Sequence, residues 1–151
     1  MEIKDRIIIE AKKLLNAPFC HSGRSTLGID CFGLFYLSYS RSGFQFDNGD
    51  GRHNSLGWWK RTDEERLRNY FLERDFIKLT ENQLPDKADI CLFKLFGKNY
   101  PAHHMGIMLN SESFIHSKCG WSSKDKRVGM DCLHPSYIKR LDFILRYKDF
   151  I

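Results

Sequence analysis

The sequence predicts an α+β fold, because segments with helical patterns come first and segments with strand patterns follow. Apolar residues at helical spacing dominate the first half of the chain, and short apolar runs between turn residues begin near Leu84. The two patterns do not alternate, which excludes a parallel doubly wound sheet. The 151 residues contain no internal repeat and no linker-like stretch, so one domain over residues 1–151 is expected.

Two helices are predicted before a long loop. The first carries apolar residues at helical spacing, namely Ile3, Ile7, Ala11, Leu14 and Leu15. It ends before Pro18. After a glycine-containing loop, Asp30 is a good N-cap for a second, buried helix that stops near Gly43. The polar, glycine-rich stretch 46–57 is predicted to be a loop.

A third helix and four strands complete the predicted order. Thr62 and Glu65 form a capping box, which predicts a helix that buries Leu67, Tyr70 and Phe71. Later in the chain, period-2 or continuous apolar runs predict antiparallel strands. These runs are residues 90–96, 104–109, 114–117 and 137–147, the last preceded by a short helical turn.

Composition excludes several classes of protein. The 24 Lys and Arg exceed the 19 Asp and Glu by a net charge of +5, which favours anionic partners in general. No long run of like charge and no DNA or RNA motif occurs, so no nucleic-acid partner is expected. No apolar run approaches the roughly 20 residues of a membrane span. The acidic start lacks a secretory signal, which predicts synthesis in the cytoplasm without a signal peptide.

Among the five cysteines, Cys31 has the most reactive expected position. It follows the N-cap Asp30, where the positive end of the helix should lower the pKa of the thiol. Gly33 leaves room beside it for whatever packs there. Cys91 and Cys132 are expected to be small buried hydrophobes. Cys20 is expected to pack or, alternatively, to be a second reactive thiol.

A nucleophilic thiol needs a base, and His104 and His116 lie on two strands of a predicted hairpin. The hairpin loop decides whether they can pair. An odd number of loop residues places both histidines on one face of the sheet, whereas an even number places them on opposite faces. His103 is adjacent to His104 and must point to the opposite face, so it competes with His104 for the role of base only if the register shifts.

These residues resemble the NlpC-type cell-wall cysteine peptidases. The resemblance rests on IEAKKLLNAPFCHSG…GIDCFGLFYLSYSRSG, on KADICLF and on HHMGIMLNSESFIHS, in the family's order. It extends from about residue 7 to about residue 147. The motif GIDC and the late run FILRY look most like those of small family members that are encoded together with phage tails and gene transfer agents.

The resemblance implies a papain-like fold in which an antiparallel sheet packs against the N-terminal helices and the nucleophile starts a helix. It implies Cys31 as nucleophile, His104 as general base and then acid, and His116 as the group that orients His104. It implies hydrolysis of peptidoglycan stem peptides at the γ-D-glutamyl-diamino acid bond, with no cofactor and no metal. Phage-tail or gene-transfer-agent proteins are implied as partners, with delivery to the wall in a phage-like particle.

Three positions differ from the family pattern, and the role of a fourth has two alternatives. Phe32 stands where the family usually has Ser, and Phe19 where it commonly has Tyr, so two hydroxyl groups at the expected substrate site are lost. Ala88 replaces a turn glycine. Asp30 either only caps the helix or also holds substrate. With Phe19, Phe32 and His103, it completes the candidate substrate-binding residues.

Residues 46–80 form a candidate wall of the groove. Within them, Trp58 and Trp59 are expected to be one buried and one half-exposed side chain rather than a sugar platform.

Other classes of function remain possible from the residues. A structural or adaptor protein would keep the fold but have a filled groove. An acyltransferase or amidase would use the same thiol in a hydrophobic groove that holds little water. A metal site would draw on Asp131, Cys132 and His134, but these lack the recurring four-ligand spacing of zinc sites, so no metal is expected.

Overall fold

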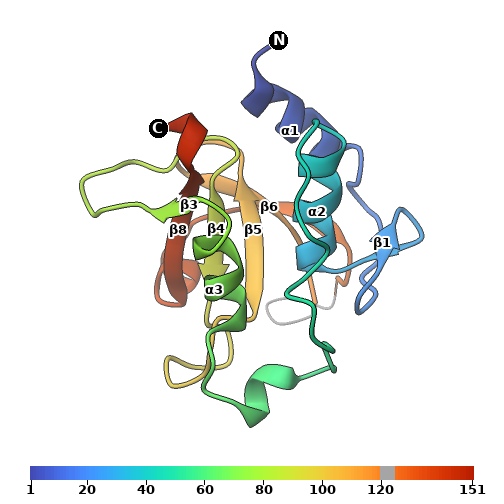
Figure 1. Ribbon diagram of the computed structural model, residues 1–151, viewed down its shortest axis with the longest axis vertical. Helices are drawn as coiled ribbons and strands as arrows, with labels where there is room; N and C mark the ends of the chain where they lie inside the picture. The colour runs from blue at the N-terminus through green and yellow to red at the C-terminus, as the bar shows by residue number, and fades with distance from the viewer. Residues whose placement is uncertain (120–124) are drawn as a thin grey trace.

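The computed structural model describes residues 1–119 and 125–151, and its centre is an antiparallel six-stranded sheet (Figure 1). The strand order is β3-β8-β4-β5-β6-β7. The strands are β3 (Phe76–Lys78), β4 (Ile90–Phe93), β5 (His104–Met108), β6 (Ser113–Ser117), β7 (Val128–Cys132) and β8 (Leu141–Tyr147). A separate two-stranded hairpin consists of β1 (Arg24–Ser25) and β2 (Gly28–Ile29).

The helices come mostly from the first half of the chain, as the α+β prediction requires. They are α1 (Ile3–Lys12), α2 (Cys31–Ser40), α3 (Arg66–Leu72) and α4 (Pro135–Ile138), with the 3₁₀ turns η1 (Trp58–Arg61) and η2 (Lys148–Phe150). The helix α2 packs against α1 and against β5 and β6 (Figure 1). The Asp30 side chain caps α2 by accepting the Gly33 N–H at 2.7 Å. None of the described helices is long and apolar enough to cross a membrane.

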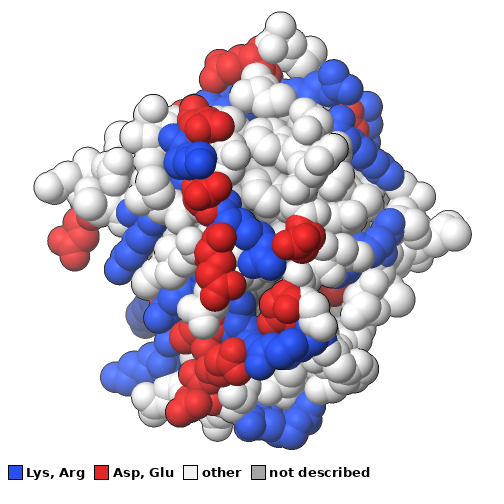
Figure 2. All heavy atoms as spheres, viewed as in Figure 1, with Lys and Arg blue, Asp and Glu red and all other residues white. Residues whose placement is uncertain are grey.

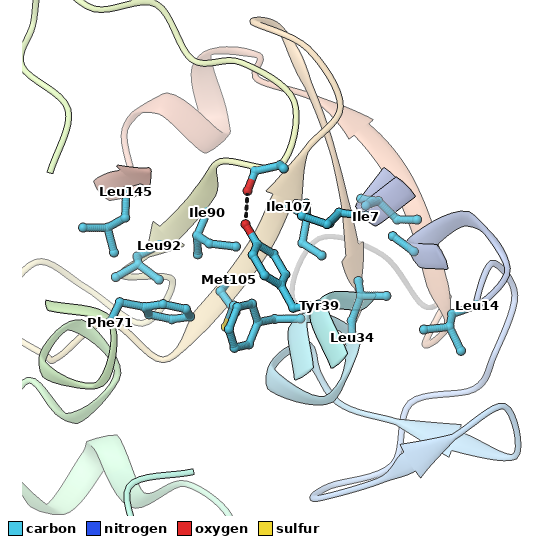
Figure 3. Packing of buried hydrophobic residues seen from close by; sticks show 14 of the residues in the cluster. Ile7, Leu14, Leu34, Tyr39, Phe71, Ile90, Leu92, Met105, Ile107 and Leu145 are labelled. Carbon is cyan, nitrogen blue, oxygen red and sulfur yellow. Dashed lines mark hydrogen bonds between the residues drawn. The ribbon is translucent and has the colours of Figure 1, made fainter. Parts of the chain in front are cut away.

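An aromatic cluster between the helices and the sheet forms much of the core. The rings of Phe35, Tyr39 and Phe71 are buried, and Phe35 lies 4.8 Å from Tyr39 and 4.9 Å from Phe71 between ring centroids. Figure 3 shows Tyr39 among the aliphatic side chains of β4 and β5, with its hydroxyl bonded to a carbonyl. That acceptor is the Ala88 carbonyl, at 2.7 Å. The core therefore ties the helix layer to the turn before β4.

The surface charges are largely paired. Arg66 binds the Asp50 carboxylate through two nitrogens, and Arg68 does the same with Asp142. On the face drawn in Figure 2, acidic and basic side chains are interleaved down the middle of the view. Side chains of opposite charge therefore lie close together on this face.

The hairpin between β5 and β6 has the odd loop that the paired-histidine hypothesis requires. Ile107 lies opposite Ile115 and Met108 opposite Phe114, which leaves residues 109–113 between the paired positions. Continuing this register puts residue 116 opposite residue 106, on the face that carries residue 104. A strand forms at each predicted run, 90–96, 104–109, 114–117 and 137–147, but β4 ends at Phe93, and α4 takes residues 137 and 138, so β8 begins only at Leu141.

The capping-box prediction for the third helix is wrong. The helix α3 starts at Arg66, and the Thr62 hydroxyl accepts the N–H of Glu64 outside it. Glu65 instead accepts the backbone N–H of Ala102, at 3.0 Å, in the segment before β5. The Glu65 carboxylate thus binds a backbone group distant in sequence instead of capping the third helix.

Candidate functional site

A cavity of about 420 Å³ opens where the start of α2 meets the start of β5. Its walls come from the loop before β1 and the start of β1, the first turn of α2, the segment 48–59, the helix α3, the residues that begin β5, and Cys119. The sequence-predicted residues that line it are Phe19, Asp30, Cys31, Phe32, His103 and His104. His116 lies behind them, in contact with His104.

Cys31 is the first residue of α2, as predicted, and its thiol points toward the start of β5. The sulfur lies 3.9 Å from the carbonyl oxygen of His103. The backbone N–H groups of Met105 and Phe32 act to lower the pKa of this thiol, but burial acts more strongly and, with the charge of Asp30, raises it. The expectation of a lowered pKa is therefore wrong, because enclosure of the sulfur outweighs the helix end.

Gly33 creates space beside Cys31, and the structure identifies what occupies it. A Cβ built on Gly33 would overlap the carbonyl oxygen of Gly23 and approach the Arg24 guanidinium at 2.9 Å. The β1–β2 hairpin therefore packs directly on the first turn of α2, and only glycine at position 33 permits that approach.

His104 and His116 are both buried and in direct contact. The Nε2 of His104 lies 2.8 Å from the Nδ1 of His116, which is hydrogen-bond distance between facing strands. Burial lowers the pKa of His104 well below its ordinary value, and the neighbouring His116 lowers it further. Burial also lowers the pKa of His116, although Asp131 opposes this. Both rings are therefore neutral near pH 7.

The structure adds Asp131, which the sequence considered only as a metal candidate. Its Oδ2 lies 2.8 Å from the Nε2 of His116. Asp131 belongs to β7, where residue 129 faces His116 and residue 131 lies on the same side one pleat further. The residues 128–132 alternate in burial along this edge strand, but only one of the five is fully buried, so the sequence signal for the strand and for Asp131 was weak.

Asp30 is engaged by three groups of the protein itself. It accepts hydrogen bonds from the backbone N–H of Gly33 at 2.7 Å, the guanidinium of Arg24 at 2.8 Å and the backbone N–H of Ser22 at 2.9 Å. These bonds hold the loop before β1 against the first turn of α2. The capping role is confirmed, whereas substrate contact by Asp30 stays a prediction.

Two pairs of ring side chains shape the cavity near Cys31. The Phe32 ring packs edge-on against Tyr70 at 4.9 Å, and the Arg24 guanidinium lies 5.3 Å from the Phe32 centroid. The His103 ring stacks on Trp59 at 4.0 Å, with the rings 7° from parallel. Burial lowers the pKa of His103 to about 4, so this ring is neutral. His103 thus belongs to the cavity wall, and it does not take part in the His104–His116 contact.

The segment 46–59 lines the cavity, as predicted for this region. Trp58 and Trp59 are both half-buried and both face the cavity, so the expectation of one buried tryptophan is wrong. Trp59 Nε1 is buried with no hydrogen-bond partner among the described residues. The indole of Trp59 is held by its stack on His103 instead.

The other cysteines have mixed outcomes. Cys91 is buried, as predicted, but Cys132 is exposed because it lies on the outward side of the edge strand β7. Cys20 is exposed, which contradicts the packing prediction for its side chain. In the part of the chain that the structure describes, no group of three or more His, Cys, Asp or Glu side chains is arranged to hold a metal ion. His134 contacts Ser136 at 2.5 Å.

Comparisons with known proteins agree with this architecture. The model of the NlpC/P60 family matches residues 16–143. No curated protein matches the sequence. An NlpC/P60 family protein from Bacillus cereus has a solved structure that is 22% identical, with a TM-score of 0.67, over 95% of this chain and 40% of that one. The present chain thus spans less than half of that protein.

Two further solved structures cover nearly the whole of both chains. The NlpC/p60 domain of the peptidoglycan hydrolase SagA is 18% identical with a TM-score of 0.57, and the match covers 95% of this chain and 97% of that one. RipD from Mycobacterium tuberculosis is 14% identical with a TM-score of 0.56, covering 96% of each chain, and is described as a non-catalytic domain adapted to peptidoglycan binding. These likenesses concern the fold, and the match of the family model over most of the sequence shows that the chain belongs to the NlpC/P60 family.

Proposed function

We propose that this protein is a cysteine peptidase that hydrolyses peptidoglycan stem peptides. Members of the NlpC/P60 family are typically peptidoglycan hydrolases that act on the cell wall. The observation that carries the proposal is one cavity lined by both Cys31 and His104, with His116 bonded to the far nitrogen of His104. A thiol, a base and a group that orients the base are the parts that thiol-dependent acyl transfer needs.

The resting protonation states define the first chemical step. The raised pKa of Cys31 and the lowered pKa of His104 place a neutral thiol beside a neutral imidazole. His104 takes the thiol proton as the sulfur attacks the substrate amide carbonyl, which forms a tetrahedral oxyanion. The backbone N–H of Cys31, at the start of α2, is a candidate donor to that oxyanion.

The remaining steps return the site to its starting state. The imidazolium of His104 gives its proton to the leaving amine, and the carbon–nitrogen bond breaks to leave a thioester on Cys31. Water then attacks the thioester carbonyl while His104 accepts a proton from the water. The carbon–sulfur bond breaks to release the new carboxylic acid, and His104 returns the proton to the sulfur of Cys31. His116 holds the ring of His104 in one orientation throughout.

We further propose cleavage at the γ-D-glutamyl-diamino acid bond, as the family resemblance implies. Stem peptides carry free carboxylates, and three arginines line the cavity: Arg24, Arg52 and Arg66. Each is already paired with a carboxylate of the protein, so a substrate carboxylate would share or displace an existing partner. The proposed selectivity therefore depends on rearrangement within these ion pairs rather than on unpaired positive charge.

A non-catalytic binding protein is the second candidate, because RipD has this fold without activity. A groove filled by Phe19 and Phe32, the two side chains that differ from the family pattern, would favour that function. Phe32 instead packs sideways on Tyr70, and the cavity in front of Cys31 is open. This arrangement supports the enzyme over the adaptor.

The decisive experiment is mass spectrometry of muropeptides after incubation of purified peptidoglycan with the protein. We expect the wild type to release fragments cut within the stem peptide, and Cys31→Ala to release none while it keeps its circular dichroism spectrum. Cys132→Ala is the matched control, since it removes an exposed thiol outside the cavity, and it should cleave like the wild type. Equal release by the wild type and Cys31→Ala would exclude the proposed peptidase.

The same digest distinguishes the finer proposals. A mass increase of one water per cleaved bond indicates hydrolysis, whereas products joined to an added amine indicate acyl transfer. Delivery in a phage-like particle and contact with tail proteins stay predictions from the sequence resemblance.

A further inference from the structure

The His104–His116 contact continues to a third group that the proposed mechanism does not yet use. His116 Nε2 lies 2.8 Å from Asp131 Oδ2, so three side chains form a hydrogen-bonded row from β7 through β6 to β5, and its last member, His104, lines the same cavity as Cys31. Asp131 is partly exposed, while His116 and His104 are buried. The row therefore leads from a partly exposed carboxylate to the cavity that Cys31 also lines.

The protonation of Asp131 decides how hydrogen atoms are arranged along this row. Its pKa is lowered, first by the hydrogen bond with His116, so the group is a carboxylate near neutral pH. A carboxylate only accepts hydrogen bonds, so the His116 Nε2 must carry the hydrogen that is donated to Asp131. A neutral His116 then has a lone pair on Nδ1.

The same logic passes to the next ring. The Nδ1 of His116 can only accept, so the Nε2 of His104, at 2.8 Å, must be the donor between them. A neutral His104 with hydrogen on Nε2 has its lone pair on Nδ1. That nitrogen is the one not used by His116, and it is the atom able to take a proton from Cys31.

We propose that Asp131 is a positioning residue that sets the tautomers of His116 and His104 and thereby makes His104 Nδ1 the proton acceptor. This inference rests on the proposed peptidase function for its effect on rate, but not for its effect on the two rings. When His104 becomes an imidazolium during the reaction, the carboxylate of Asp131 stabilises that charge through His116.

The surroundings hold Asp131 in place. The Tyr137 hydroxyl of α4 donates to its Oδ2 at 3.3 Å, and the Lys118 ammonium lies 4.0 Å away. Gly129, opposite His116, leaves space that the Lys118 side chain fills, because a Cβ there would approach Lys118 at 2.8 Å. The lysine and the tyrosine both stabilise the ionised carboxylate.

Charged and titratable groups reach the row from every side. They are Asp131 from β7, Lys118 after β6, Tyr137 from α4, His103 before β5, and Asp30 with Cys119 near the thiol. Any pH profile of the row reflects this whole set.

The test compares Asp131→Asn, Asp131→Glu and the wild type with ¹⁵N-labelled histidine. Long-range ¹H–¹⁵N correlation spectra report which ring nitrogen carries hydrogen, and this readout needs no substrate. We expect both His104 and His116 of the wild type to be protonated on Nε2. Asp131→Asn offers a donor as well as an acceptor, so the Nε2 form should lose population in both rings, and Asp131→Glu should restore it.

Kinetics of stem-peptide cleavage supply the second readout. We expect Asp131→Asn to lower kcat by about tenfold or more with little change in KM, because Asp131 is not among the residues that line the cavity. Asp131→Glu should recover part of the loss. Asp142→Asn is the matched control, an Asp of the same sheet that pairs with Arg68 outside the cavity, and it should change neither the tautomers nor kcat.

The outcomes separate the two proposals. A wild-type His104 that carries hydrogen on Nδ1 overturns the inference even if Asp131→Asn fails to fold. Wild-type tautomers and kcat retained in a folded Asp131→Asn protein overturn it as well. A wild type that shows the expected tautomers but cleaves no peptidoglycan supports the positioning role and contradicts only the peptidase function.

Discussion

Cys31 shows how two local effects compete at one residue. The start of α2 and two backbone N–H groups favour a thiolate, but burial of the sulfur and the nearby Asp30 charge disfavour it more strongly. The His103 carbonyl, 3.9 Å from the sulfur, is an acceptor that suits a protonated thiol. The Cys31 side chain at rest is therefore a thiol, and in the proposed mechanism its proton leaves during the attack.

The reactivity of Cys31 toward iodoacetamide should follow this protonation state. Because the pKa of Cys31 is raised, the thiolate fraction is small near pH 7 and grows only as the pH rises. We expect alkylation of Cys31 to accelerate from about pH 6 to about pH 10 without a plateau near neutrality. Peptide mass spectrometry after timed labelling measures it, with exposed Cys132 as the internal reference. Fast, pH-independent alkylation below neutrality would instead reveal a thiolate–imidazolium pair.

At the scale of elements, an ion pair fixes the middle of the segment 46–57 beside the cavity. Asp50 binds Arg66 of α3 through both carboxylate oxygens, at 2.8 and 2.9 Å, and also pairs with Arg52. The hydrogen bond with Arg66 is the largest of the effects that lower the pKa of Asp50 to about 2. This part of the cavity wall is thus fastened to α3 by charge, while Phe46 at the start of the segment packs on the core rings of Phe35 and Phe76.

Asp50→Asn should destabilise the protein in a pH-dependent way. The pKa of Asp50 falls from 3.8 to about 2 on folding, a difference worth about 2 kcal/mol when the group is ionised. Since the folded pKa is the lower one, this contribution is complete above about pH 4 and is lost as the pH falls toward 2. Urea unfolding of wild type and variant at several pH values measures it.

Asp63→Asn, at an exposed position nearby, is the control and should change stability by less than about 0.5 kcal/mol. A stability gap between wild type and Asp50→Asn that stays constant from neutral pH to about pH 2 would contradict the ion-pair account.

Elements with strong local signals were predictable from the sequence, and those that depend on distant partners were not. The helix at Cys31 has an N-cap, an apolar body and a glycine after its end, and it folds as expected. The start of α3 was missed because Glu65 bonds to Ala102, far along the chain. The edge strand β7 was missed because it is short and half exposed, so its apolar signal is weak.

At the scale of the molecule, the candidate site lies at the junction of two layers. The helix layer supplies Cys31, and the sheet supplies His104, His116 and Asp131. The sequence led us to expect the first three together through the family resemblance, since local patterns gave Cys31 its helix start but left the parity of the hairpin loop open. Asp131 and Trp59 were not predictable, since the β6–β7 register and the path of the segment 46–59 involve contacts that no local pattern records.

The contact between these layers can be weakened at one atom. The Tyr39 hydroxyl on α2 donates to the buried Ala88 carbonyl at 2.7 Å, in the turn that leads into β4 (Figure 3). Tyr39→Phe leaves that carbonyl without its donor, so we expect the free energy of unfolding to fall by about 1–3 kcal/mol in urea titrations. Tyr36→Phe, on the half-buried side of the same helix, is the control, with an expected change below about 0.5 kcal/mol. Because neither ring lines the cavity, both variants should cleave peptidoglycan fragments at the wild-type rate while folded. A Tyr39→Phe protein as stable as the wild type would mean that this bond adds nothing to the attachment of the helices to the sheet.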